Sequence, residues 1–173
     1  MAERQVCHDC LIWQKKGRQL FINHALYQYN ETMRQYFQYY KFQGGYHLNQ
    51  VFKNELQTVV QTIGADLIIP IPISANTYLQ RGFNQVIGLL ADLELHEYLL
   101  CKADKQTQVQ KSRIERLKSS QPFFIVERVK KQLSGKKVCL VDDVYTTGTT
   151  LHHAAKLLDL AGAKTIYTVT LAR

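Results

Sequence analysis

The spacing of apolar residues along the chain predicts strands and helices in alternation. Strands are expected over residues 20–29, 66–70, 98–102, 123–126, 138–141 and 165–172. Apolar residues recur every three or four positions over residues 30–41, 48–62 and 84–95 and again from residue 151, which predicts helices there. Strands that alternate with helices favour an α/β fold, with a mainly parallel central sheet and helices on both faces.

Two of these helices have inward faces that the sequence pattern assigns. The first is expected to begin after an N-cap at Asn30 and to carry on one face Met33, Tyr36, Phe37 and Tyr40. The second is expected to turn inward Val51, Phe52, Leu56, Val59 and Val60. Residues 70–72 are expected to end a strand and begin a loop. Residues 103–121 are polar and lack periodicity, so a long loop is expected there.

An acidic pair and a hydroxyl-rich turn follow the apolar strand 138–141. The pair is Asp142 and Asp143, and the turn contains Tyr145, Thr146, Thr147, Gly148, Thr149 and Thr150. The N–H groups of such a loop and of the helix after it attract an anion, and Gly148 lets the backbone approach a ligand closely. The two carboxylates are suited to ribose hydroxyls or a hydrated Mg²⁺. The arrangement predicts a sugar-phosphate site.

These thirteen residues, 138–150, resemble the 5-phosphoribosyl-1-diphosphate (PRPP) motif of the type I phosphoribosyltransferases. The resemblance implies that fold for residues 19–173, and Mg²⁺ bound together with PRPP. It implies that Asp142 and Asp143 are the catalytic ribose-contacting pair and that residues 145–150 wrap the 5′-phosphate. The alternative interpretation is a buried strand followed by an ordinary helix-start loop.

Further segments resemble the ComF (ComFC) competence family. They are Ile69 to Ser74 with Arg81 to Gln85, Tyr39 to Gly44, and a looser match around Thr107 to Leu117. The resemblance implies a pyrophosphate site formed by Pro72, Ile73, Ser74, Arg81 and Lys41. It also implies a mobile basic loop that closes over pyrophosphate and includes Gln110, Arg113 and Arg116.

Positive charge is concentrated in one part of the chain. Residues 102–137 hold eleven Lys and Arg against three acidic residues, so they account for the whole net charge of +8. Such a segment suits a polyphosphate or a nucleic-acid backbone. The alternative is a solvated loop whose lysines keep the protein soluble.

Residues 1–18 are expected to form an N-terminal appendage around Cys7 and Cys10, a partial zinc-ribbon-like element. ComF proteins usually carry two such cysteine pairs, and structural zinc needs four ligands. Either a second pair lies upstream of this start or the module is absent. His8 and His24 are weak candidate ligands, and a redox pair is a further alternative. Trp13 is expected either to pack the appendage or to stack on single-stranded DNA.

The resemblance favours a ComF-type competence protein that binds PRPP and acts in single-stranded DNA uptake with membrane-associated machinery. The alternatives are an active phosphoribosyltransferase for an unidentified base or amine, and a PRPP-sensing regulator. No apolar run approaches the roughly 18 residues that span a bilayer. A cytoplasmic location is therefore expected, or a peripheral one at the inner face of the membrane. His152 and His153 are expected to face solvent.

Overall fold

A computed structural model describes residues 8–15, 23–102 and 121–173. The strands are β1 (Asn23–Tyr27), β2 (Leu67–Pro70), β3 (Leu99–Cys101), β4 (Phe123–Ile125), β5 (Lys137–Val144) and β6 (Thr165–Ala172). The α-helices are α1 (His8–Lys15), α2 (Glu31–Phe42), α3 (Asn49–Thr62), α4 (Ala75–Arg81), α5 (Gln85–Leu89), α7 (Lys130–Leu133) and α8 (Thr149–Leu160). Two 3-10 turns, η1 (Tyr46–Leu48) and η2 (Glu127–Val129), precede α3 and α7.

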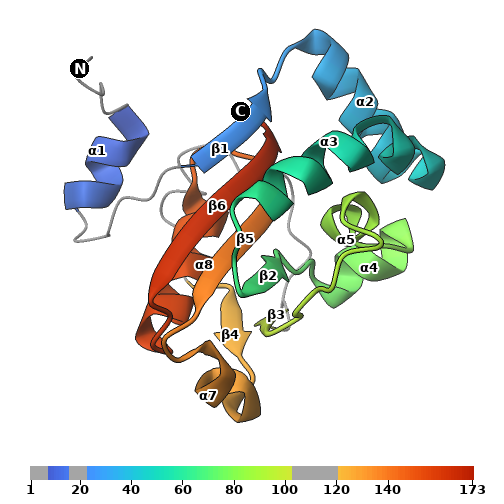
Figure 1. The fold of residues 1–173 in the computed structure, drawn as a ribbon. Coiled ribbons are helices and arrows are strands. Elements are labelled where there is room, and N and C mark those ends of the chain that lie inside the picture. Colours follow the sequence, from blue (N-terminus) through green and yellow to red (C-terminus); the bar gives the residue numbers. More distant parts are fainter. Residues whose placement is uncertain (1–7, 16–22, 103–120) are drawn as a thin grey trace.

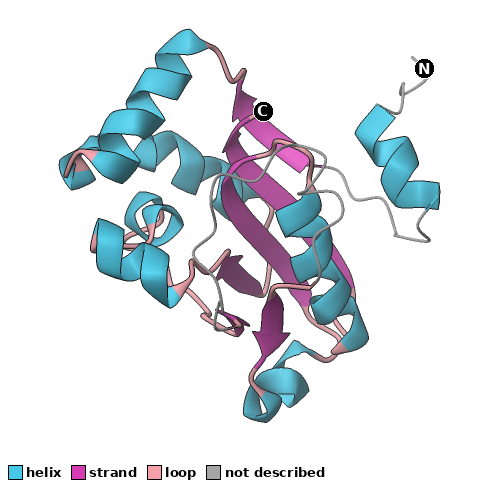
Figure 2. Ribbon diagram, turned by 180° about the vertical axis from the view of Figure 1, so that it is seen from behind, coloured by secondary structure: helices cyan, strands magenta, loops and turns pink. Residues whose placement is uncertain are grey.

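The central sheet has the order β1-β6-β5-β2, and each neighbouring pair in it is parallel. Strands β3 and β4 form a separate antiparallel pair. Helices α2, α3 and α5 cover one face of the central sheet, and α8 covers the other together with the β3–β4 pair (Figures 1 and 2). The predicted α/β architecture, with helices on both faces of a parallel sheet, is confirmed.

Side chains alternate across β5, which lies in the middle of the sheet, and so build two cores. Cys139 and Val141 pack with the α2, α3 and α5 face, whereas Val138 and Leu140 pack with α8. All four are fully buried. Burial on both faces explains why this segment is a nearly continuous apolar run in the sequence.

Three local predictions were wrong in their extent. Strand β5 continues to Val144 rather than ending at residue 141, because its ladder with β6 extends through both aspartates. Helix α5 ends at Leu89, and Asp92 beyond it adopts a left-handed φ of 85° that no helix can contain. Helix α4 lies inside the predicted loop and begins after Ser74, whose hydroxyl accepts a hydrogen bond from the backbone N–H of Thr77 at 3.1 Å.

Helices α2 and α3 match their predictions closely. The Asn30 side chain accepts a hydrogen bond from the backbone N–H of Met33 at 2.9 Å, which confirms the predicted N-cap. Val51 is an exception, because it is exposed rather than turned inward. It lies five residues from the buried Leu56, which places it about 140° away around the helix.

Candidate functional site

Asp142 and Asp143 lie just before the end of β5, at the carboxyl edge of the sheet. Ligands of parallel α/β sheets bind beyond this edge. Because successive residues of a strand face opposite sides, Asp143 lies on the face covered by α2 and α5, and Asp142 lies on the face of α8. Both residues are buried, at 7% and 6% exposure. Two carboxylates in such a position are costly unless cations or hydrogen-bond donors face them.

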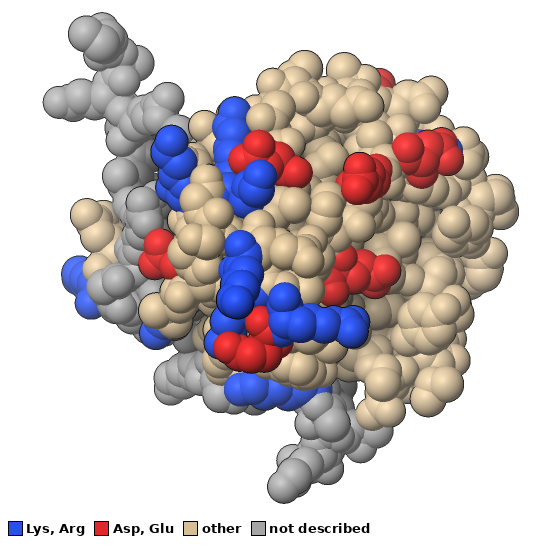
Figure 3. Space-filling model, turned by 60° about the horizontal axis from the view of Figure 1, so that its bottom comes forward, with Lys and Arg blue, Asp and Glu red and all other residues tan. Residues whose placement is uncertain are grey.

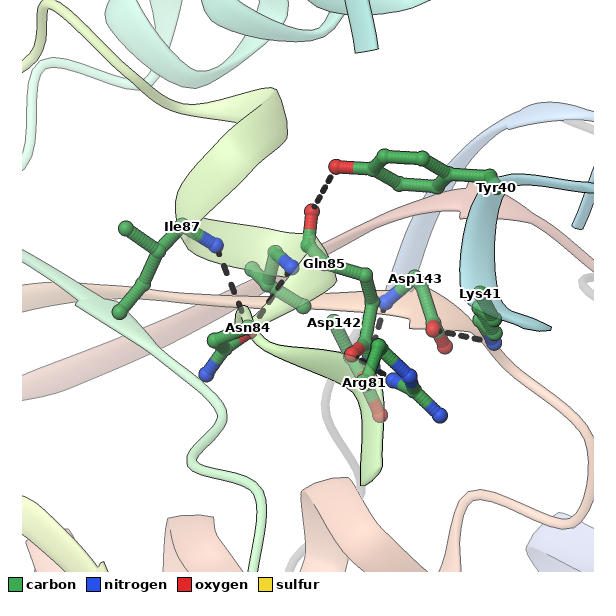
Figure 4. A network of polar contacts seen from close by, with 9 residues as sticks. Tyr40, Lys41, Arg81, Asn84, Gln85, Ile87, Asp142 and Asp143 are labelled. Carbon is green, nitrogen blue, oxygen red and sulfur yellow. Dashed lines mark hydrogen bonds and ion pairs between the residues drawn. The ribbon is translucent and has the colours of Figure 1, made fainter. Parts of the chain in front are cut away.

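Basic side chains from two helices converge on Asp143 (Figure 4). Lys41, near the end of α2, forms an ion pair with the Asp143 carboxylate. Arg81, the last residue of α4, donates through Nη1 to the side-chain oxygen of Gln85. The Gln85 side chain in turn hydrogen-bonds to Asp143. Two cations from different helices therefore lie around one buried carboxylate.

The environment drives the pKa values of the two aspartates apart. Burial raises the pKa of Asp142, and the negative charge of Asp143 raises it further. Burial would also raise the pKa of Asp143, but the ion pair and hydrogen bond with Lys41, assisted by Gln85, outweigh it and lower that pKa. Asp143 is therefore an ion-paired carboxylate. Asp142 is the carboxyl group that lacks a comparable cation and gains most from a ligand that brings positive charge or hydroxyl donors.

Asn84 fixes the loop that leads from β2 to this site. Its side-chain amide donates to the carbonyl of Ile71 at 3.0 Å, and its side-chain oxygen accepts from the backbone N–H of Val86 at 2.8 Å. The Tyr40 hydroxyl donates to the carbonyl of Gln85 at 2.8 Å and joins α2 to the start of α5. Sequence reasoning drew only Arg81 from the segment 81–85, although the polar pair Asn84-Gln85 opening a helix was a usable signal.

The turn between β5 and α8 is held by its own side chains. Thr147 and Thr149 share a hydrogen bond between their hydroxyl oxygens at 2.8 Å. Gly148 has a left-handed φ of 72°, and it immediately precedes α8. A Cβ atom there would overlap the hydroxyl of Tyr145, whose ring belongs to the buried core under the turn. Because Gly148 has no side chain, it leaves the first N–H groups of α8 without a cap from that position.

Some residues assigned to the pyrophosphate loop form hydrogen bonds that stabilise the fold. Ser74 caps α4, and the carbonyl of Pro72 accepts a hydrogen bond from the Cys101 thiol at 3.5 Å. Ile73 lies between them in the same partly exposed segment. The structure thus brings this loop, Lys41 and Arg81 to the carboxyl edge that carries the aspartates.

Several predicted site residues lie outside the described residues. They are Gln110, Arg113, Arg116 and Cys7. Cys10 falls within α1, but its side chain is not among those described. In the described ranges, no group of three or more His, Cys, Asp and Glu side chains could hold a metal ion. Zinc binding by the appendage stays a prediction.

The N-terminal helix contacts the hydroxyl-rich turn. Trp13 is only 2% exposed, and its indole N–H donates to the carbonyl of Thr147 at 2.9 Å. Its ring stacks on His152 with the centroids 4.5 Å apart. His152 and His153 are both buried, so the expectation that they face solvent was wrong. The Trp13 ring of α1 packs against both histidine rings and contributes to their burial.

Comparison with known proteins shows the family to which the chain belongs. Residues 80–173, more than half of the chain, match the phosphoribosyl transferase domain family. Competence protein ComFC of Streptococcus pneumoniae is 39% identical over 170 residues, which cover 96% of this chain and 74% of that protein. Competence protein ComFC of Bacillus subtilis is 31% identical over 177 residues, covering 97% and 72%. A solved glutamine phosphoribosylpyrophosphate amidotransferase from B. subtilis is 22% identical with a TM-score of 0.46, over 71% of this chain and 26% of that one.

The parallel sheet, the acidic pair at its carboxyl edge and the matched domain define a protein of the phosphoribosyltransferase class. Within that class, the chain belongs to the ComFC family of competence proteins. In the part of the chain that the structure describes, no helix is long and apolar enough to cross a membrane.

Proposed function

We propose that the protein binds PRPP with Mg²⁺ at the carboxyl edge of the sheet and acts with single-stranded DNA in natural transformation. The observation that carries the proposal is the buried pair Asp142 and Asp143, faced by Lys41 and Arg81 and followed by the turn at Gly148. One ligand that fits all these groups has a ribose between two phosphate-bearing ends.

Each end of such a ligand has a chemical counterpart. The N–H groups at the start of α8 suit the 5′-phosphate, because a helix N-terminus carries partial positive charge. Lys41 and Arg81 suit the pyrophosphate. The Nε atom of Arg81 is buried and has no hydrogen-bond partner among the described residues, so an anion there would satisfy it. The carboxylates between the two ends suit the ribose hydroxyls.

The residues present also fit a magnesium ion that arrives with the ligand. Magnesium is commonly held by one or two carboxylates together with substrate phosphates, so a complete protein cage is not required. Asp142 is the better candidate, because burial and the negative charge of Asp143 raise its pKa and a bound cation would relieve that cost. When bound, Mg²⁺ would neutralise part of the charge of the diphosphate.

Calorimetric titration with PRPP and Mg²⁺ tests this site. The wild-type protein should bind PRPP, and the double variant Asp142→Asn with Asp143→Asn should lose most of that affinity while remaining folded. The matched control is Asp92→Asn, which removes an exposed carboxylate from the loop after α5. Equal affinity of the double variant and the wild type would refute the ribose assignment. Pyrophosphate release on adding candidate bases would distinguish an active transferase from a PRPP-binding protein.

The DNA part of the proposal is supported by a basic face at the opposite end of the sheet. It consists of the exposed side chains of Arg128, Lys130, Lys131, Lys136 and Lys164. The turns that carry it are joined, because the backbone N–H of Lys164 donates to the carbonyl of Lys136 at 2.8 Å. Figure 3 shows Lys and Arg side chains at this end of the molecule with acidic side chains among them, and Lys130 forms an ion pair with Glu127 at 2.6 Å. The basic residues from Arg128 to Lys137 therefore lie away from the aspartates, where they leave the proposed PRPP site accessible.

Salt-dependent binding of a single-stranded oligonucleotide tests the basic face. The variant Lys130→Gln with Lys131→Gln should bind more weakly and show a salt slope reduced by about 1 to 2. The control Arg34→Gln with Lys156→Gln removes the same charge from exposed positions on α2 and α8. If both double variants change the salt slope equally, the effect is one of net charge and the basic face is not the DNA site.

A further inference from the structure

The contact between α1 and the hydroxyl-rich turn joins residues 134 positions apart in the chain. A buried indole that donates to a main-chain carbonyl is more than apolar packing, because it selects one orientation of a peptide group. The peptide concerned links Thr147 to Gly148, directly before α8. This is the part of the protein that the proposed function assigns to the 5′-phosphate.

The orientation of that peptide matters for anion binding. In a trans peptide the C=O and the following N–H point in opposite directions. When the carbonyl of Thr147 faces Trp13, the N–H of Gly148 faces away from α1. Glycine tolerates either orientation of a neighbouring peptide, since it adopts positive and negative φ with similar ease. Some interaction outside the turn is therefore needed to hold a single arrangement.

The rest of the turn already has fixed points on the other side of Gly148. The carbonyl of Gly148 accepts the backbone N–H of His152 at 2.8 Å, as in the first turn of a helix. The hydroxyl of Thr147 bonds to that of Thr149. The Trp13 indole supplies a restraint from outside the turn, on the carbonyl of Thr147, and its stacking on His152 fixes the ring itself.

We propose that Trp13 is a positioning residue for the phosphate turn: its indole N–H holds the Thr147–Gly148 peptide so that the Gly148 N–H faces the 5′-phosphate. The inference rests on the proposed function for the identity of the anion. It also gives the N-terminal appendage a role in the site that does not depend on zinc. One neutral hydrogen bond is worth a roughly three- to tenfold change in an equilibrium.

The substitution Trp13→Phe tests the proposal, because it keeps an aromatic ring and removes the donor. Leu11→Ala is the control, since Leu11 lies exposed on the same helix. Without ligand, amide hydrogen exchange in residues 145–152 should be roughly three- to tenfold faster in Trp13→Phe and unchanged in Leu11→Ala. Unchanged exchange in Trp13→Phe would overturn the positioning role, whether or not PRPP is the ligand.

Two ligands separate positioning from general destabilisation. Ribose 5-phosphate should bind roughly three- to tenfold more weakly to Trp13→Phe, whereas pyrophosphate, held by Lys41 and Arg81, should bind as it does to wild type. An equal loss for both ligands would mean that Trp13 is merely structural. If the wild type binds neither ligand, the proposed function fails, and the exchange measurement alone decides the role of Trp13.

The wild-type protein offers a direct readout, because Trp13 is the single tryptophan of the chain. Its fluorescence emission should change when ribose 5-phosphate is added and stay constant with pyrophosphate. Constant emission at a ribose 5-phosphate concentration that calorimetry shows to be saturating would count against contact between Trp13 and an occupied phosphate turn.

Discussion

Replacing Lys41 with methionine should destabilise the protein in a strongly pH-dependent way. The side chain of Lys41 is 17% exposed and that of Asp143 9%, so the ion pair between them is largely shielded from water. Methionine keeps an unbranched side chain and removes the charge, together with the contact of Lys41 Nζ with the Phe37 ring at 4.4 Å from its centroid. Asp143 then stays buried without its cation, and its pKa must rise.

The size and sign of the effect follow from proton linkage. In the wild type the pKa of Asp143 is lowered, so the ion pair stabilises the fold above the unfolded value of about 4 and is lost as the pH falls below it. In Lys41→Met the raised pKa of Asp143 makes its ionised carboxylate destabilise the fold instead. The cost should grow by about 1.4 kcal/mol for each pH unit above about 4, up to the new pKa. We expect a loss of about 1 kcal/mol at pH 5 and about 3 kcal/mol at pH 8.

Urea denaturation at the two pH values measures this difference. Lys53→Met is the matched control, because its partner Asp92 has a side chain 72% exposed and such a pair contributes less than about 1 kcal/mol. The double variant Lys41→Met with Asp143→Asn should recover much of the lost stability at pH 8. A loss that is equal at pH 5 and pH 8, and that Asp143→Asn does not relieve, would refute the reasoning.

Three further predictions follow from burial and backbone geometry. Asp142→Asn should raise the unfolding free energy by about 2 kcal/mol at pH 8 and by less at pH 5, because the pKa of Asp142 is raised on folding. The same variant should bind PRPP more weakly. A gain in stability over the wild type that is equal at pH 5 and pH 8 would contradict this prediction. Gly148→Ala should cost at least about 1 kcal/mol more than Gly64→Ala, which also has positive φ but open space around it, as thermal unfolding would show. Asn84→Ala should cost about 2 kcal/mol in urea denaturation, through the lost loop bond and cap, against less than about 0.5 kcal/mol for the exposed Asn76→Ala.

Much of the fold follows from short-range patterns. The period of apolar residues located α2, α3 and the strands of the parallel sheet, and Asn30 was correctly identified as a cap. The errors were at element ends, in the burial of Val51 and the two histidines, and in the helices α1, α4 and α7, which the pattern did not predict. An aspartate disfavours a strand by itself, yet pairing with β6 carries β5 through Asp142 and Asp143. Such pairing depends on a strand more than twenty residues away in sequence, which local patterns do not contain.

The candidate site shows the same division. The order of strand, acidic pair, hydroxyl-rich turn and helix indicated a sugar-phosphate site from sequence, because each part has a chemical role that does not depend on its neighbours in space. The basic segment looked like one unit in sequence. Its residues from Arg128 to Lys137 instead lie at the amino edge of the strands, because the chain reverses between β4 and β5 and carries them to the opposite end from the aspartates.

The sequence by itself determined the fold class, the family and the residue types that meet a sugar phosphate, because these depend on periodicity and on contiguous motifs. Only the tertiary structure decided which carboxylate is ion-paired, that Gln85 lies between Arg81 and Asp143, and that Trp13 holds the turn before α8. Apart from the short-range bond between Arg81 and Gln85, these contacts join segments far apart in the sequence, such as Trp13 and Thr147. Their energies come from burial and charge in a shared environment, which exists only once the chain has folded.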